Sequence, residues 1–122
     1  MAVVYIATLK NTRLDAVTTA VGATGELEIG DSGFATILAT IPLANPIGAG
    51  AAGGVLTLTM PQSDTSADDT GTAAEARITD GAATNIVTGL TVGLAATDVI
   101  LDSLSITAGQ TVTINSATIT HG

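Results

Sequence analysis

The stretch "PQSDTSADDTGTAAEARITD", residues 61–80, holds five of the eleven acidic residues in this 122-residue chain. Closely spaced carboxylates can bind a divalent cation or act as general acid and base. An EF-hand loop needs oxygen ligands at positions 1, 3, 5 and 12 and a glycine at position 6. Counted from Asp64, Glu75 stands at position 12, but position 6 is not glycine, and the flanking sequence does not predict helices.

The preferred interpretation of this stretch is structural. Pro61–Thr72 is predicted to be an acidic, mobile connection between strands. Its carboxylates are expected to be solvated or to form at most a weak calcium site, with Asp64, Asp68 and Asp69 as the candidate ligands. Ala73–Thr79 then alternates apolar and charged residues, which predicts a strand at the edge of a sheet. On that strand the inward residues are Ala74, Ala76 and Ile78, and the outward ones are Glu75 and Arg77.

A glycine-rich motif, "GAGAAG" at Gly48–Gly53, matches the dinucleotide-binding pattern G-x-G-x-x-G. That pattern binds a pyrophosphate only between a strand and a helix, because the N-terminus of the helix faces the phosphates. Here Pro46 precedes the motif and the strand-like "VLTLTM" follows it. We therefore interpret Asn45–Gly54 as a mobile loop between strands.

A second motif, "GDSG" at Gly30–Gly33, resembles the nucleophile segment of chymotrypsin-like proteases. A serine nucleophile needs a histidine base within hydrogen-bond reach. The only histidine, His121, is next to the C-terminus and follows the serine, which is the wrong order for that family. A tight I′ or II′ turn between two strands is the preferred interpretation.

One further carboxylate, Asp102, is embedded in the apolar run "DVILDSLSIT" at 98–107. A glycoside hydrolase would need two such acids on facing strands. An inward Asp102 would need a polar partner, so we expect a local bend to turn it outward.

The composition of the chain excludes several classes of function. A net charge of −8 and a pI near 4.1 argue against binding to nucleic acid or to anionic membranes. The absence of cysteine excludes disulfides and thiolate metal sites. Only 2% of the residues are aromatic, and His, Lys and Arg are few, which argues against an enzyme and against a cofactor site. The first residues, "MAVVYIATLK", resemble no secretory signal, and a soluble protein made in a cytoplasm is expected.

Alternation with a period of two dominates the chain and predicts half-buried strands. The predicted strands lie at 26–30, 34–41, 55–60, 74–79, 86–92, 98–107 and 110–120. This spacing predicts an all-β fold over a single domain, 1–122: an antiparallel β-sandwich or barrel, jelly-roll-like, of about seven strands. In the last strand, Val112 and Ile114 have the opposite parity to Ala117 and Ile119, which predicts a β-bulge near Asn115–Ser116.

One short helix is predicted over residues 12–21, because Leu14, Val17 and Val21 recur at helical spacing. Thr12 and Asp15 resemble a capping box, and Gly22 is placed to end the helix. Residues 1–8 are then expected to form an N-terminal arm or a short strand.

Three segments together resemble small structural proteins encoded among tailed-bacteriophage and prophage virion genes. They are "TLKNTRLDAVTTAVG...GELEIGD", "GGVLTLTMPQSDTSADDTGTAAEARITD" and "DVILDSLSITAGQTVTINSATITHG". The resemblance implies a virion component without catalysis, most simply a head decoration (cement) protein that binds the major capsid protein. A neck or tail component is the neighbouring alternative, and a calcium- or carbohydrate-binding β-module is the alternative from another class.

A decoration protein would be made in the cytoplasm of a bacterial host and would end on the capsid surface, where a homo-oligomer, by preference a trimer, is expected. The contacts with capsid or subunits are expected in the arm Ala2–Ile6 and in the loop Asn45–Gly54. The candidate contact residues are Val3, Val4, Tyr5, Pro46 and Ile47.

Overall fold

The computed structural model of the chain describes residues 5–48 and 50–120. These residues form one α-helix, one 3₁₀ turn and ten strands, several of them short. In chain order the elements are α1 (Ala7–Val21), β1 (Glu26–Gly30), η1 (Ser32–Phe34), β2 (Ile37–Pro42), β3 (Val55–Thr57), β4 (Gln62–Asp64), β5 (Gly71–Thr72), β6 (Glu75–Thr79), β7 (Asn85–Gly93), β8 (Val99–Leu101), β9 (Ser105–Ile106) and β10 (Val112–Thr120).

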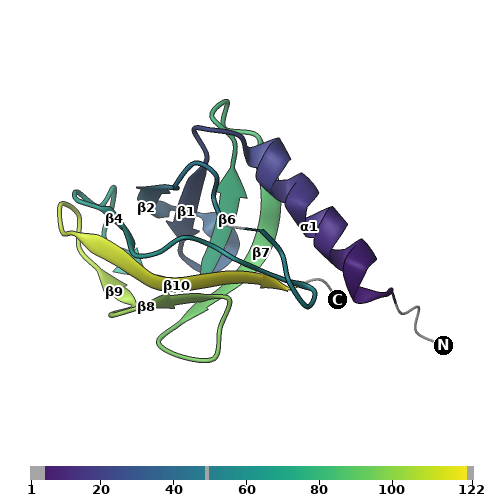
Figure 1. Cartoon of the computed structure of the whole chain (residues 1–122). Coiled ribbons are helices and arrows are strands. Elements are labelled where there is room, and N and C mark those ends of the chain that lie inside the picture. The colour runs from purple at the N-terminus through teal and green to yellow at the C-terminus, as the bar shows by residue number, and fades with distance from the viewer. Residues whose placement is uncertain (1–4, 49, 121–122) are drawn as a thin grey trace.

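The main sheet curls into a half-barrel, with its strands in the order β2-β1-β6-β7-β8-β10-β3. β4 pairs with β10 outside this order, and β5 and β9 form a separate two-stranded ladder. The helix α1 packs against β3 and β7, and Figure 1 shows it on the opposite side of the molecule from β2 and β4. The predicted class, a β-sandwich or barrel with one N-terminal helix, is confirmed.

The sheet is mixed rather than purely antiparallel. β7 and β8 run parallel, with Val92 opposite Val99, although only residues 94–98 connect the two strands. The Asp98 carboxylate stabilises this connection by accepting hydrogen bonds from the N–H and the hydroxyl of Thr91, both at 3.0 Å. The expectation of an antiparallel sheet is therefore wrong at this one ladder.

Aliphatic side chains and alanines fill the core, as the composition predicts. Alternation places every second residue of the central strands inside, because successive side chains of a strand point to opposite faces. Neither Tyr5 nor Phe34 is fully buried. The largest fully buried apolar side chains are Leu27, Ile29, Leu38, Ile41, Ile47, Leu56, Ile78, Ile106, Ile114, Val21 and Val99.

The bulge predicted in the last strand is present. The register between β10 and β8 shifts between Ile114 and Ser116. One extra residue there returns Ala117 and Ile119 to the core, on the same side as Val112 and Ile114.

Several predicted strands have different limits, and the strand predicted at 55–60 already ends at Thr57. The strand predicted at 34–41 begins only at Ile37, because Ser32–Phe34 forms the 3₁₀ turn η1. The strand predicted at 98–107 is divided into β8 and β9, and Asp102 lies exposed between them. The bend expected at Asp102 is confirmed.

The helix is longer than predicted, because it begins at Ala7 rather than at residue 12. The residue before it, Ile6, offers no side-chain cap, and the Thr12 hydroxyl instead donates to the carbonyl of Thr8 at 3.1 Å. The capping box at Thr12 is therefore wrong, and so is the arm or strand over residues 1–8 where it overlaps the helix. The C-terminal end is confirmed, because Gly22 has φ 74° and donates its N–H to the Thr18 carbonyl.

The strand predicted at Ala73–Thr79 is the interior strand β6, not an edge. It pairs with β1 on one side and with β7 on the other. Ala76 and Ile78 are buried as predicted, but Ala74 is exposed and Ala73 is buried. The strand begins only at Glu75, so the alternation does not extend back to Ala74.

Within the described residues, no helix is long and apolar enough to span a membrane.

Candidate functional site

The acidic residues that could do chemistry lie along one side of the half-barrel. Asp64 ends β4 and is half-buried, whereas Asp68 and Asp69 are exposed in the following turn. We call residues 64–69 the acidic strap. β4 pairs with β10 on one side and packs against β2 on the other, so the strap bridges two strands that lie far apart in the sheet order.

Two carboxylates of the strap meet at one residue of β2. The Oδ2 atom of Asp64 accepts the backbone N–H of Thr40 at 3.0 Å. The Oδ2 atom of Asp68 accepts the hydroxyl of the same threonine at 2.7 Å. The other Asp64 oxygen, Oδ1, accepts the N–H of Ser66 at 2.9 Å, which fixes the turn of the strap.

The backbone of the strap completes this junction. The N–H groups of Asp68 and Asp69 donate to the Leu38 carbonyl at 2.8 and 3.3 Å, on the edge of β2 away from β1. Ala67 donates to Gln110 at 2.8 Å and accepts from Gly109 at 2.9 Å, at the start of β10. Without the strap, the Leu38 carbonyl and the Thr40 N–H would lack these hydrogen-bond partners at the edge of β2. The strap supplies the partners and so closes the sheet on this side.

The strap does not resemble an EF-hand. Glu75, the residue needed at position 12, lies on β6, and its Oε2 atom accepts the N–H of Gly33 at 2.6 Å. Among the described residues, no three or more His, Cys, Asp or Glu side chains are grouped so that they could hold a metal ion.

Most of the other carboxylates also accept hydrogen bonds from backbone N–H groups instead of pointing into an open cavity. Asp31 accepts from Thr36 at 2.9 Å and so closes the connection between β1 and β2. Asp80 accepts from Ala82 and Thr84, both at 2.9 Å, within the turn between β6 and β7. Within residues 5–48 and 50–120, seven of the eleven acidic residues accept a backbone N–H: Asp15, Asp31, Asp64, Asp69, Glu75, Asp80 and Asp98.

An ion pair among the described residues joins β1 and β6. Arg77 Nε donates to Glu28 Oε1 at 2.7 Å, and the two side chains are only 25% and 15% exposed. The guanidinium also lies 4.3 Å from the ring centroid of Phe34. This side chain therefore ties a cross-strand pair to the η1 turn, a structural role rather than a catalytic one.

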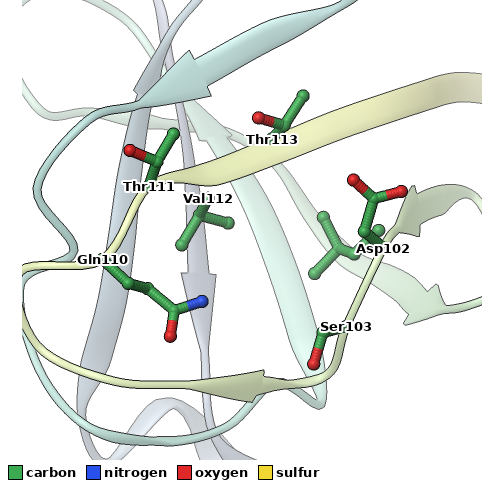
Figure 2. Close-up of a pocket in the computed structure, with 7 residues that line it drawn as sticks. Asp102, Ser103, Gln110, Thr111, Val112 and Thr113 are labelled. Carbon is green, nitrogen blue, oxygen red and sulfur yellow. The ribbon is translucent and has the colours of Figure 1, made fainter.

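A small hollow in the described structure lies between the end of β8 and the start of β10. Figure 2 shows Asp102 and Ser103 on one side of it and Gln110 and Thr111 on the other. Its volume is about 70 Å³. That is room for a few waters and far below the roughly 300–1,000 Å³ of a small-molecule pocket. Asp102 Oδ1 accepts a hydrogen bond from the side-chain amide of Asn115. Asp102 is the one acid among the residues that line the hollow, so the hollow lacks the pair of carboxylates that a glycosidase uses.

The two sequence motifs have structural roles. "GDSG" contributes to a six-residue connection, Asp31–Thr36, with Asp31 N–H donating to Thr36 at 3.3 Å. It is not the two-residue I′ or II′ turn that was expected, and Gly33 and Phe34 both have positive φ, at 76° and 54°. Ser32 is exposed, and His121 lies outside the described residues.

"GAGAAG" is held against α1. The N–H of Ala51 donates to Asp15 Oδ1 at 2.8 Å, and the N–H of Gly54 donates to Asn11 Oδ1 at 2.9 Å. A strand, β3, follows the motif, so the helix N-terminus that a pyrophosphate needs is absent there. The loop between strands is confirmed, and its anchoring to α1 is a feature that the sequence did not predict.

The predicted contact residues fall into different environments. Val3 and Val4 lie outside the described residues, and the half-buried Tyr5 ring lies 4.5 Å from the Arg13 guanidinium. Pro46 is exposed, but Ile47 is fully buried in the core. The expectation of an exposed Ile47 is wrong, because this side chain is part of the hydrophobic core.

Sequence reasoning missed two exposed apolar residues, Leu9 on the first turn of α1 and Leu94 after β7, whereas Ile6 belongs to the arm Ala2–Ile6 that was expected to make contacts. Ile6 is 72% exposed and Leu9 is 41% exposed. Placing the helix start at residue 12 hid Leu9. The available signal was the spacing of Lys10 from Leu14 and Val17, which extends the helical period toward the N-terminus.

Comparisons with protein families, curated proteins and solved structures found no match to this chain.

Proposed function

We propose that this chain is a non-enzymatic structural protein of a tailed-phage or prophage virion. The preferred assignment is a head decoration (cement) protein that binds and stabilises the shell of major capsid protein. The observation that carries the proposal is the use of the carboxylates. Seven of the eleven accept backbone N–H groups and so hold the fold together instead of lining a ligand site. The proposed function therefore lies in contacts that the outer surface makes with other proteins.

The character of that surface supports binding to a larger assembly. A net charge of −8 keeps free copies apart and gives complementarity to basic patches on a shell. A shell presents the same patch many times, so a modest contact per copy is sufficient for high occupancy when copies are linked. The closed β2 edge also limits uncontrolled strand pairing between free copies.

The proposal places the protein on the capsid surface after synthesis in the bacterial cytoplasm, as a homo-oligomer with a trimer preferred. The exposed Pro46 and the N-terminal residues up to Tyr5 remain the proposed shell contacts, whereas the buried Ile47 is not proposed again. A neck or tail component is the second candidate, because the resemblance in sequence extends to those neighbouring gene products.

The experiment is to purify particles and measure the ratio of this chain to the major capsid protein. A fixed ratio that reflects the symmetry of the shell, with density on the outer capsid surface in images, is the expected result. Density at the neck or tail would select the second candidate, and absence from particles would reject both. The protein has no Trp and one Tyr, so the ratio should come from mass spectrometry or staining rather than from ultraviolet absorbance.

Adding purified protein back to shells that lack it gives an independent test. Binding should saturate, and it should weaken as ionic strength rises, because salt screens exposed charges. A matched acidic protein of similar size should not bind.

A further inference from the structure

Two irregularities of the sheet meet beside the hollow at the start of β10 and orient one carboxylate. Asp102 is exposed at the bend between β8 and β9. The bulge in β10 lies opposite, and the side-chain amide of Asn115, within the bulge, donates a hydrogen bond to Asp102 Oδ1. Bulges commonly re-aim a side chain near a functional site. The bend and the bulge together therefore fix the position of Asp102 at the hollow.

The size and the walls of the hollow restrict what can enter it. Leu101 and Val112 are buried at its base. Figure 2 shows Gln110 and Thr111 across the hollow from Asp102. A volume of about 70 Å³ admits the end of one side chain and is far too small for a sugar ring or a nucleotide.

The hydrogen bonds of the described residues leave an acceptor on each side of the hollow. Asn115 occupies Asp102 Oδ1, and no described residue bonds to Oδ2. The Thr111 hydroxyl likewise has no partner among the described residues. An ammonium group carries three N–H donors on one atom and can donate to two such acceptors at once. A guanidinium forms its strong bidentate pair only with both carboxylate oxygens, and one of these is already bonded.

Charge selects the same class of ligand. Asp102 is the one charged residue among those that line the hollow, and the whole chain carries a net charge of −8. A neutral group placed over the carboxylate would remove it from water without supplying an opposite charge. The occupant that fits the hollow is therefore a small cation with N–H donors.

We propose that the hollow receives the ammonium group of a lysine side chain from another protein. The single lysine of this chain, Lys10, is half-buried on α1 beside Gly54, which makes a second copy a poor source. Figure 1 shows α1 on the opposite side of the molecule from β9 and the start of β10, so Lys10 of the same copy is also excluded. The identity of the partner, a subunit of the shell, rests on the proposed function, whereas the recognition of an ammonium group does not.

The first experiment titrates the protein with n-butylammonium, which carries the end of a lysine side chain, and follows the amide signals by NMR. Saturating shifts should be confined to the residues that line the hollow and to the side-chain amide of Asn115. Asp102→Asn removes the charge but keeps an acceptor for Asn115, and it should weaken the apparent affinity by about fivefold. Asp69→Asn is the matched control, because it removes an exposed charge outside the hollow, and it should bind like the wild type.

Methylguanidinium, the corresponding mimic of arginine, should bind more weakly than n-butylammonium. Thermal melts check that both variants are folded. Shifts spread over all the exposed acids, equal effects of the two substitutions, or tighter binding of methylguanidinium would overturn the proposal.

The second experiment adds the same variants back to shells that lack the protein. Asp102→Asn should bind about fivefold more weakly than the wild type, and Asp69→Asn should bind as the wild type does. Equal binding of Asp102→Asn and the wild type would overturn the lysine contact and leave the proposed function standing. A wild type that binds no shell would reject the proposed function and the shell as the source of the lysine, and the titration alone would then decide whether the hollow binds an ammonium group.

Discussion

The Oδ2 atom of Asp64 accepts the backbone N–H of Thr40 at 3.0 Å, across 24 positions of sequence. Through this bond a side chain takes the place of a neighbouring strand at the edge of β2. The hydroxyl of Thr40 binds Asp68 at the same point, so two acids of the strap serve one residue of the sheet. The acidity of this segment is therefore explained by closure of the fold.

Replacing Asp64 should destabilise the protein. Asp64→Ala leaves two backbone N–H groups without their acceptor, at Thr40 and Ser66. The expected loss is about 1–3 kcal/mol in the free energy of unfolding, measured by urea denaturation. Asp69→Asn is the control, and it should cost less than about 0.5 kcal/mol because its site is exposed. Equal effects of the two substitutions would contradict closure of the sheet by Asp64.

Arg77 should stabilise the folded protein through both its ion pair with Glu28 and its stacking on Phe34. Arg77→Ala removes the half-buried ion pair with Glu28 and the stacking on Phe34, for an expected loss of about 1–2 kcal/mol. Arg77→Lys should recover part of that loss, since it keeps the charge but not the planar guanidinium. A double-mutant cycle with Glu28→Gln measures the pair itself, and a coupling energy of zero would show that the ion pair adds nothing.

The bulge in β10 should be essential for folding. Deleting Ser116 forces a regular register, which would turn Ala117 and Ile119 out of the core or Val112 and Ile114 out of it. We expect loss of cooperative unfolding by calorimetry and loss of dispersed amide signals by NMR. Asn115→Ala keeps the residue count, and this variant should remain folded. A deletion variant that melts like the wild type would show that the strand can shift its register without penalty.

Calcium should not stabilise the protein. Because the described acids form no group of three or more around a common point, the melting temperature is expected to change by less than about 1 °C at millimolar calcium. Magnesium at the same concentration controls for ionic strength. A rise seen with calcium alone, and abolished by Asp68→Asn, would restore the cation site among Asp64, Asp68 and Asp69.

Local patterns in the sequence predicted the elements whose cause is local. Alternation located the main strands, because side chains of a strand point to opposite faces whatever the strand pairs with. The parity break in 110–120 located the bulge, and Gly22 located the end of the helix. The start of α1 was missed, because Ile6 provides no capping side chain that would mark it.

The chain by itself therefore determined an aliphatic all-β fold with one helix and a shortage of catalytic residue types. Only the tertiary structure decided what the acids do. Asp64 and Thr40, Glu75 and Gly33, and Asp15 and Ala51 are brought together by the fold. Sequence spacing cannot show such pairs, because a carboxylate accepts any N–H within reach, and the curl of the sheet decides which N–H that is.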